Sequence, residues 1–466
     1  MTFGINEDVL EEKLEKLERA RTWSPRVIAK LESFIRSGND FLLFRINPIR
    51  FSKEKEISEE ESIILFLFGR KVGLFRMEWQ LLCNRCGDVV ESFSSLEIVD
   101  SEFFCNMCAF DGEASMDDMV EVSFTVSPQV RRIRCHDPDS LSAEDYFLKY
   151  RISQNALVED GRKLVDMMID SGRLLTFLEV GETRDFEVEV TPGFLGTSFG
   201  LSFQVEGKTE EKVQSFSHRI VKKPERHIES LAPGKLSLRL ENASPDRLPV
   251  AIFSFPSPPS GPHFEPFLSG KKLLTTQTYR DLFESDRVAT NDGISIRDIT
   301  FVFTDLKGST ALYEKIGDLK AFDLVRQHFD YLREAINRNH GAIVKTIGDA
   351  VMASFYSPVD AVEAALGMLE RIERFNEEYG EKILILKIGM HRGHSIAVTL
   401  NDRLDYFGQT VNIASRVQQL ADADEIYLTD DVFRFPDVRE KLQELHIEAH
   451  TAKLKGITTD IQVYRL

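Results

Sequence analysis

The chain has 466 residues, more than one hydrophobic core usually holds, so its length predicts two to four domains. Hydrophobic residues make up 42% and charged residues 29% of the sequence, the balance of a folded globular protein rather than a disordered one. Asp and Glu number 76 against 58 Lys and Arg, which gives a formal charge of −18. This excess argues against a protein that coats nucleic acid or an anionic membrane, and we expect neither as a partner.

The apolar runs are short, and the cysteines are few. The longest run, Ile63–Phe68, is far below the ~20 residues of a membrane-spanning helix and predicts a buried strand. The acidic start of the chain is unlike a signal peptide. Four of the five cysteines fall in two C-x-x-C pairs, which points to metal binding in a reducing compartment. We therefore expect a cytoplasmic protein.

Two helices are predicted in the first forty residues. Apolar residues recur at helical spacing after Asn6, a candidate N-cap, and a second helix is expected to end at Gly38. The first helix could form a coiled coil between subunits or pack on its own domain. Two heptads are too few for a coiled coil, so they favour the second interpretation.

The cysteine pairs form the pattern C-x2-C-x18-C-x2-C. Four thiolates in two such pairs are typical of one tetrahedral zinc ion with no open position, so the pattern predicts a structural zinc ribbon over 83–108 and one Zn²⁺ per chain. Residues 87–118 contain no Lys or Arg, which argues against a nucleic-acid-binding ribbon. The four expected ligands are Cys83, Cys86, Cys105 and Cys108. Cys135, beside His136, could be a fifth ligand, a redox thiol or an ordinary buried thiol, and we favour the last.

Apolar residues alternate with polar ones between Phe186 and Leu240, a pattern that predicts a small antiparallel β-sandwich. Five prolines between Pro256 and Pro266 mark a stiff connector. From Ser295 the sequence alternates strands with long helices. We thus predict an α+β chain with four parts: helices and a zinc ribbon in 1–150, a β-rich domain in 151–266, a linker in 267–295 and a domain of strands and long helices in 296–466.

Two acidic residues of the last part lie at the ends of predicted strands. Asp305 follows the apolar strand Ile299–Phe303 and precedes a small-residue loop, Gly308-Ser309-Thr310, that enters a helix. Such a loop can meet phosphate oxygens with its N–H groups while the carboxylate holds a cation. Asp349 lies at the tip of a predicted hairpin that should flank the first strand. The two carboxylates suit a pair of divalent ions, although either could serve the turn or strand end alone.

The same region carries four motifs in order: FTDLKGST, VKTIGDAVMASF, DYFGQTVNIASRV and LKGI. Residues 296–466 resemble, by these motifs, the catalytic domain of the class III nucleotidyl cyclases. The resemblance implies a ferredoxin-like βαββαβ fold and a homodimer. It also implies two Mg²⁺ or Mn²⁺ ions per active site, held by Asp305 and Asp349.

Further roles follow from the same resemblance. Lys345 and Asp405 match the pair that reads the adenine edge, which implies ATP; guanylyl cyclases of the family typically carry Glu and Cys there. Asn412 and Arg416 match the residues that orient the ribose and stabilise the transition state. Lys455 matches the lysine that contacts the terminal phosphates, and the loop Gly308-Ser309-Thr310 is expected to contact phosphate. His394 stands near a position where some members carry a phosphate-binding Arg, and its role stays open.

We therefore expect an adenylate cyclase that converts ATP to 3′,5′-cyclic AMP and pyrophosphate at the interface of a homodimer. The upstream half also resembles an uncharacterised region that precedes cyclase domains in some bacterial proteins, with phrases such as SPRVIAKLESFIRS and VEVSFTVSP. It is expected to regulate the enzyme through a ligand or protein that the sequence does not name. The alternatives are a guanylate cyclase and a nucleotide-binding signalling module whose catalysis is vestigial.

Overall fold

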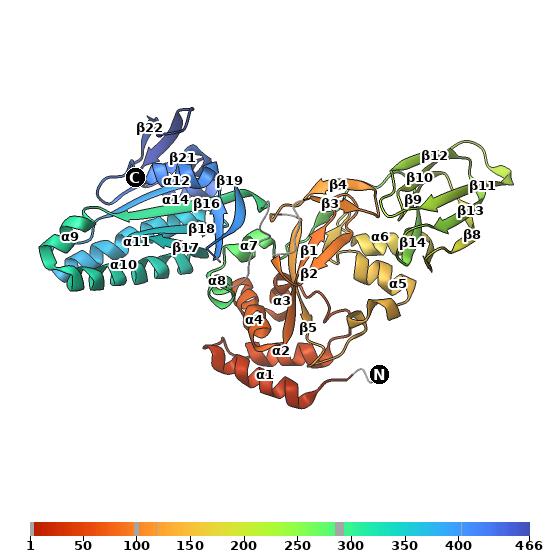
Figure 1. Ribbon diagram of the computed structural model, residues 1–466, viewed down its shortest axis with the longest axis horizontal. Coiled ribbons are helices and arrows are strands. Elements are labelled where there is room, and N and C mark those ends of the chain that lie inside the picture. The colour runs from red at the N-terminus through yellow and green to blue at the C-terminus, as the bar shows by residue number, and fades with distance from the viewer. Residues whose placement is uncertain (1–3, 97–101, 118, 285–292, 402) are drawn as a thin grey trace. The chain divides into compact units, whose positions relative to one another are not determined.

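The computed structural model describes residues 4–96, 102–117, 119–284, 293–401 and 403–466. Residues 97–101 of the predicted zinc ribbon and 285–292 of the predicted linker lie outside this description. The chain divides into two compact units (Figure 1). The first holds most of the chain up to Leu268, and the second holds Ser269–Leu466 together with the short segments 95–96 and 115–117. Among the described residues, no helix has the length and apolar character needed to cross a membrane.

The first unit begins with four helices: α1 (Glu7–Ala20), α2 (Val27–Ser37), α3 (Pro48–Lys55) and α4 (Glu59–Val72). The Asn6 side chain accepts the Val9 N–H and caps α1, and Gly38 ends α2, as predicted. The apolar stripe of α1, which includes Leu10 and Leu17, is buried within its own chain. This confirms that α1 packs on its own domain.

The prediction of a strand at Ile63–Phe68 is wrong, because these residues lie in α4. The helix is buried on nearly every side over Ile63–Leu67, so no polar face interrupts the apolar run and its period is lost. The residues at the two ends of α4 do indicate a helix. The Ser58 hydroxyl caps its first turn, three glutamates follow, and Gly73 ends it in the left-handed conformation.

An antiparallel sheet in the order β2-β1-β5 follows these helices, and a separate hairpin carries the second cysteine pair. Its strands are β1 (Phe75–Leu82), β2 (Val89–Phe93) and β5 (Val120–Val126), and the hairpin consists of β3 (Glu102–Cys105) and β4 (Phe110–Glu113). Short elements lead from there to the sandwich: η2 (Arg134–His136), η3 (Pro138–Ser140), α5 (Ala143–Asp145), η4 (Tyr146–Arg151), β6 (Ala156–Leu157) and α6 (Leu164–Ser171). Strand β6 pairs with β15 (His263–Phe264), beyond the sandwich in sequence.

Two sheets form the predicted sandwich, one in the order β12-β10-β9-β14-β7 and one in the order β11-β13-β8. Their strands are β7 (Gly172–Leu178), β8 (Thr183–Val190), β9 (Gly193–Thr197), β10 (Leu201–Val205), β11 (Glu210–Ile220), β12 (His227–Leu231), β13 (Gly234–Asn242) and β14 (Leu248–Phe255). Alternate residues of both sheets, such as Phe203 and Leu238, share one core. The sandwich is mixed rather than antiparallel, because β10 pairs with β12 and β11 pairs with β13 in parallel.

The second unit opens with two short helices, α7 (Gly270–Leu274) and α8 (Gln277–Leu282), and contains a large sheet with helices against it (Figure 1). Its strands are β16 (Ile294–Leu306), β17 (Gly341–Ile347), β18 (Ala350–Phe355), β19 (Leu386–Leu400), β20 (Arg403–Phe407), β21 (Glu425–Thr429), β22 (Glu448–Ala452) and β23 (Ile461–Arg465). The helices are α9 (Ser309–Ile316), α10 (Asp318–Arg338), α11 (Pro358–Tyr379), α12 (Gln409–Gln418), α13 (Asp430–Phe433) and α14 (Pro436–Leu442).

The chain order within this unit is β16, two helices, β17, β18, α11 and β19, which is a βαββαβ arrangement. The strands lie side by side as β17-β18-β16-β19, and every pairing among them is antiparallel. Strands β21, β23 and β22 extend the sheet beyond β19. A single apolar core, including Leu332 of α10, Met368 of α11 and Ile388 of β19, fixes the long helices on the sheet.

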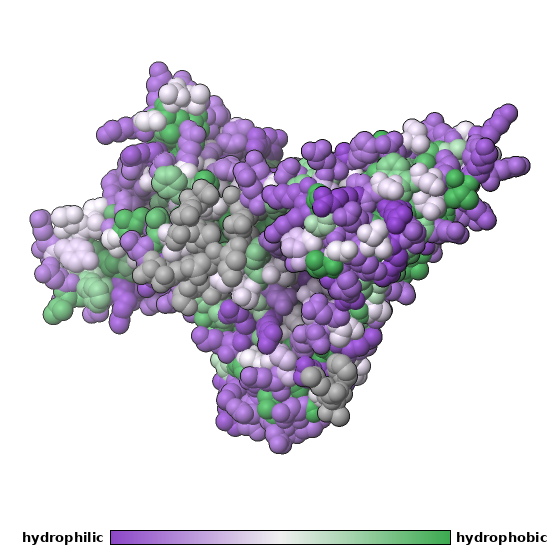
Figure 2. All heavy atoms as spheres, turned by 45° about the vertical axis from the view of Figure 1, so that its right-hand side comes forward, coloured by the Kyte–Doolittle hydropathy of each residue, from purple (hydrophilic) through white to green (hydrophobic). Residues whose placement is uncertain are grey.

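The molecular surface seen in Figure 2 is mainly hydrophilic, with small hydrophobic areas scattered over it. This agrees with the high content of charged residues and with the enclosure of most large apolar side chains in the cores.

Candidate active site

Two carboxylates meet at one end of the sheet. Asp305 is near the end of β16, and Asp349 lies in the two-residue turn between β17 and β18, where Gly348 adopts a φ of +65°. Because β18 pairs with β16 up to Thr304 and Val351, the turn residue comes next to Asp305. The predicted hairpin and its position beside the first strand are thus present. The structure brings Asp305 and Asp349 together, as the sequence suggested.

The negative charges of the two carboxylates repel each other. Burial and the neighbouring charge of Asp349 raise the pKa of Asp305, while Lys387, its partner in β19, opposes the shift. One carboxylate oxygen of Asp349, Oδ2, is buried and accepts no hydrogen bond from any described residue. A buried carboxylate oxygen without a donor, next to a second acid, fits a divalent cation that both groups would hold.

A buried histidine that the sequence analysis missed lies under this pair. His328 is on the buried stripe of α10, and its charge state is coupled to Asp349. Burial lowers the pKa of His328 to about 4, although Asp349 opposes the shift, so the ring is neutral at physiological pH. The signal in the sequence was a histidine at a position of α10 where the helical pattern demands an apolar residue.

Lys345 of β17 and Asp405 of β20 form an ion pair. The Lys345 Nζ lies 2.5 Å from Asp405 Oδ2, and the other oxygen, Oδ1, accepts the Tyr406 N–H at 2.8 Å. The Asp405 side chain is only 10% exposed, whereas that of Lys345 is 40% exposed. Two residues sixty positions apart therefore present one donor and one acceptor side by side.

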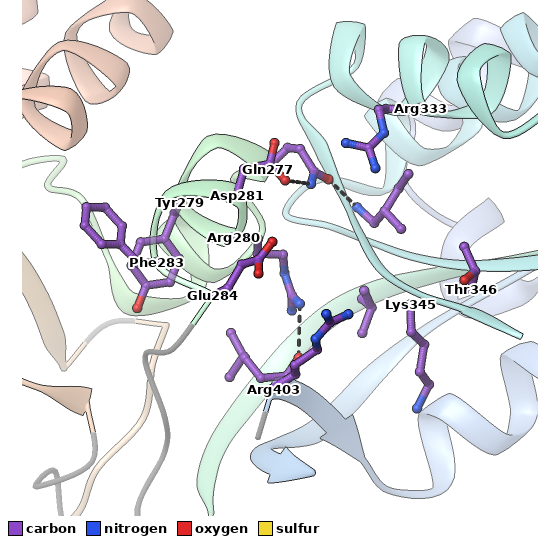
Figure 3. A pocket seen from close by; sticks show the side chains of 13 residues that line it. Gln277, Tyr279, Arg280, Asp281, Phe283, Glu284, Arg333, Lys345, Thr346 and Arg403 are labelled. Carbon is purple, nitrogen blue, oxygen red and sulfur yellow. Dashed lines mark hydrogen bonds between the residues drawn. The ribbon is translucent and has the colours of Figure 1, made fainter. Parts of the chain in front are cut away.

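Helix α8 contacts the strands that carry this pair (Figure 3). Gln277 Oε1 accepts the N–H of Ile343 in β17 at 2.7 Å, and Arg280 Nη1 donates to the carbonyl of Leu404 in β20 at 3.1 Å. A cavity of about 240 Å³ lies between α8 and these strands, with Lys345 and Arg403 among its lining residues.

The remaining predicted residues belong to the same unit, where Asn412 and Lys455 are exposed and Arg416 is half-buried. Asn412 and Arg416 are four residues apart on α12, whose opposite face, with Ala414 and Val417, is buried. Arg416 donates to Gln419 at 3.1 Å. Lys455 is exposed in the loop between β22 and β23. In the described part of the chain, no hydrogen bond or ion pair joins Asn412, Arg416 or Lys455 to the Lys345–Asp405 pair.

The small-residue loop enters a helix as predicted. Gly308 has a φ of +74° and precedes α9, which begins with Ser309 and Thr310. His394 of β19 bonds through Nε2 to the Ser295 hydroxyl of β16 at 3.0 Å, so it already has a structural partner.

The four cysteines of the first unit form a compact cluster. All four sulfur atoms lie within 4.8 Å of one another, and the pairs Cys83–Cys108 and Cys86–Cys105 are each 3.6 Å apart. A tetrahedral zinc ion with Zn–S bonds of about 2.3 Å places its sulfurs roughly 3.8 Å apart, so the cluster fits the ion. Cys105 also bonds to buried Asp88, whose carboxylate is paired with Arg151.

Cys135 is outside this cluster. Burial raises the pKa of its thiol to about 12, which suits the ordinary buried thiol that we favoured. Both ring nitrogens of the adjacent His136 are used locally, one accepting the Ile133 N–H and the other bonding to the Val126 carbonyl.

Two protein families match the chain. A family of unknown function, DUF5939, matches residues 10–281, more than half of the chain. The adenylate and guanylate cyclase catalytic domain matches residues 294–466. The chain belongs to the DUF5939 family and carries a class III cyclase catalytic domain. The cyclase domain confirms the resemblance carried by the four motifs.

Curated relatives agree with the cyclase domain. An adenylate cyclase from Anabaena cylindrica is 29% identical over 187 residues, which cover 37% of this chain and 37% of the relative. Adenylate cyclase 2 of Rhizobium meliloti is 29% identical over 161 residues, which cover 32% of this chain and 40% of the relative. The chain thus spans about two fifths of the length of these two relatives.

Solved cyclase structures are similar to part of the chain. The adenylyl cyclase CyaB from P. aeruginosa is 22% identical with a TM-score of 0.33, and the match covers 38% of this chain and 95% of that one. The guanylate cyclase domain of RhGC from Catenaria anguillulae, in complex with GTP, is also 22% identical with a TM-score of 0.33, covering 37% of this chain and 96% of that one.

Proposed function

We propose that this protein is an adenylate cyclase that converts ATP to 3′,5′-cyclic AMP and pyrophosphate. The observation that carries the choice of substrate is the Lys345–Asp405 pair in the cyclase domain. Adenine offers a ring acceptor at N1 and an amine donor at its exocyclic position. Lys345 donates to the first and Asp405 accepts from the second. Guanine presents a carbonyl and a ring N–H at these places, so the same pair would face it with the wrong groups.

Other residues of the domain act on the ribose and the phosphates. Asn412 orients the ribose, and Arg416 neutralises the charge that develops at the α-phosphate when the 3′-hydroxyl attacks it. Lys455 holds the terminal phosphates, which leave as pyrophosphate. The backbone N–H groups of the Gly308–Thr310 loop meet phosphate oxygens at the start of α9.

Asp305 and Asp349 are the residues that would hold two divalent cations, Mg²⁺ or Mn²⁺. When bound, such ions neutralise the phosphates and lower the pKa of the attacking hydroxyl. The unpaired buried oxygen of Asp349 and the raised pKa of Asp305 support this role. A cation beside both carboxylates would satisfy the Asp349 oxygen and lower the pKa of Asp305.

We propose that the working enzyme is a homodimer. Large apolar side chains beside the site are exposed in the single chain. Ile347, two residues before Asp349, is 52% exposed, and Phe407, two residues after Asp405, is 65% exposed. A second copy of the domain would cover them. The first unit then serves as a regulatory module.

The test compares kcat/KM for ATP and GTP in the wild-type protein and in a Lys345→Glu, Asp405→Cys double variant. We expect wild type to prefer ATP, and the exchange to lower ATP use and raise relative GTP use. Each mismatched polar group costs on the order of 1–3 kcal/mol, which corresponds to a factor of about 5 to 150. An unmoved ATP:GTP ratio would show that the pair does not read the base. A wild type that prefers GTP would favour a guanylate cyclase, and one that turns over neither would favour the signalling module.

A further inference from the structure

The first unit contains a cavity of about 330 Å³ beside the cysteine cluster. Its floor is the outer face of the sandwich sheet at β9, β10 and β14, and one wall is helix α6. Two of the cysteines, Cys86 and Cys108, face it together with Met107, and the segment 258–262, with its prolines, completes the lining. The volume lies within the range of small-molecule binding sites.

The sequence of the sheet creates the hollow. The side chains of Leu195, Leu201 and Phe203 point into the sandwich core, so their neighbours Gly196 and Ser202 point outward. Gly196 and Ser202 lie directly opposite each other in adjacent strands. Two of the smallest residues therefore sit together on a face where Phe194, Phe253 and Phe255 provide large side chains around them. The sheet therefore forms the floor of the cavity, and the phenylalanine side chains surround it.

The lining is apolar and adaptable. Besides the three phenylalanines it contains Leu164 and three methionines, Met107, Met167 and Met168. Methionine side chains are flexible and polarisable, and they accommodate ligands of irregular shape. The apolar body of a small molecule would be well covered here.

The charged residues of the lining are all positive. Arg85 and Arg226 contribute to the cavity, and no Asp, Glu or Lys does so among the residues that the structure describes. The whole chain, by contrast, has 76 acidic residues and 58 basic ones. Arg85 lies 3.9 Å from the ring centroid of Phe110, which leaves its charge without a carboxylate partner there. Within the described part of the chain, no ion pair or hydrogen bond is found for the Arg226 side chain.

We propose that this cavity binds a small amphiphilic anion, a molecule with an apolar body and a terminal carboxylate. The phenylalanines and methionines cover the body, and the guanidinium of Arg226 receives the carboxylate. A saturated acid of about ten carbons matches the class of ligand that cavities of this volume hold. The site is independent of the proposed cyclase activity, because all its residues belong to the first unit.

Decanoate is the probe, titrated by calorimetry into the full-length protein. We expect one molecule per chain, with decanol and decyltrimethylammonium binding at least tenfold more weakly because neither carries a negative charge. Arg226→Glu should weaken decanoate binding at least tenfold. The control variant Arg239→Glu changes an exposed arginine of β13 that is not part of the cavity, and it should bind as wild type does.

A second variant, Ser202→Phe, separates binding from folding, since it fills the cavity floor from the outer face of the sheet. It should abolish decanoate binding without lowering the melting temperature. Failure of wild type to bind decanoate would overturn the proposal. So would equal binding of decanol, or decanoate binding that survives both Arg226→Glu and Ser202→Phe. Cyclase activity has no part in these measurements, so their outcome is separate from that of the proposed function.

Discussion

Gln277 accepts the backbone N–H of Ile343 at 2.7 Å, two residues before Lys345. One turn further along α8, Arg280 donates to the carbonyl of Leu404, the residue before Asp405. A third contact comes from α7, whose Leu274 carbonyl accepts the hydroxyl of Tyr406 at 3.3 Å. The two short helices that precede the cyclase domain thus hold both strands that carry the proposed base-reading pair. We expect their position to set the separation of the donor and the acceptor.

We therefore predict that Gln277→Ala or Arg280→Ala lowers the ATP:GTP ratio of kcat/KM. Loss of one such hydrogen bond costs on the order of 1 kcal/mol, which corresponds to about a fivefold change. The measurement is the ratio for the two nucleotides, because a purely structural defect would lower both rates together. Gln443→Ala, at an exposed position after α14, is the matched control. An unchanged ratio with a lower melting temperature would mean that these residues serve stability alone.

We predict that Asp305→Asn and Asp349→Asn each reduce kcat by on the order of 100-fold or more while the fold survives. Each change removes a charge but little volume, so the loss should be in cation binding. Because the pKa of Asp305 is raised, the apparent affinity for Mg²⁺ in wild type should fall as pH decreases and protons compete. Asp323→Asn, at an exposed position of α10, is the control. Near wild-type turnover at saturating Mg²⁺ would contradict the two-cation site.

The cysteine cluster leads to a prediction about metal content. One zinc should copurify with each chain, and Cys83→Ser or Cys105→Ser should lose it and lower the melting temperature, since metal-binding free energy contributes to folding. Cys135→Ser, outside the cluster, should keep the zinc. Elemental analysis of freshly purified, reduced protein provides the measurement. A wild-type preparation without zinc would refute the prediction.

Glu121 of β5 predicts a pH dependence of stability. Burial raises the pKa of its carboxyl to about 7 in the folded protein, although Arg45 and Arg50 oppose the shift, against an ordinary value of 4.5. Asn155 donates to one of its oxygens at 2.6 Å. The folded state binds this proton more tightly than the unfolded chain. The contribution of this proton to the free energy of unfolding is therefore full below about pH 4.5 and is lost as the pH rises to about 7.

We predict that Glu121→Gln keeps the bond from Asn155 but removes this dependence. At pH 8 the variant should be more stable than wild type by up to about 3 kcal/mol, and the difference should shrink towards pH 4.5. Urea unfolding at pH 5, 6, 7 and 8 measures it, with the exposed Glu91→Gln as control. A pH profile identical to that of wild type would contradict the raised pKa.

Short-range signals made much of this structure predictable. The cap at Asn6 and the turn at Gly348-Asp349 depend on a few neighbouring residues, and both are present as predicted. The four cyclase motifs are also short runs of neighbouring residues, and they contain most residues of the candidate site. Tertiary context decided the rest. The run Ile63–Phe68 is helical because the helix is enclosed on nearly every side, which no local pattern records.

Contacts between segments far apart in the chain could not be predicted from the sequence either. Strand β10 pairs with β12, and β11 pairs with β13, in parallel. The alternation of apolar and polar residues along a strand reads the same in both directions, so the sequence does not distinguish parallel from antiparallel pairing. His328 became part of the site only when α10 lay under the turn that carries Asp349. Gln277 lies in the segment predicted as a linker, and its contact with Ile343 spans 66 positions.

The last prediction tests the shared active site of the proposed dimer. Lys345 and Asp349 are close in sequence, yet the resemblance to class III cyclases implies that they serve different sites. The aspartates of one subunit would face the base-reading pair and Asn412 of the other across a two-fold axis. Asp305→Asn and Asn412→Ala proteins should then each be nearly inactive. A mixed dimer of the two would place both changes in one site and leave the other intact.

Co-expression of the two variants should therefore restore activity. With random pairing, half of the dimers are mixed and each has one working site of two, so cyclic AMP production should recover to roughly a quarter of the wild-type value. Mixing two preparations of the same variant is the control and should give no recovery, because every site then carries the same defect. If differently tagged subunits show that mixed dimers form but activity stays absent, each active site must be built from a single chain.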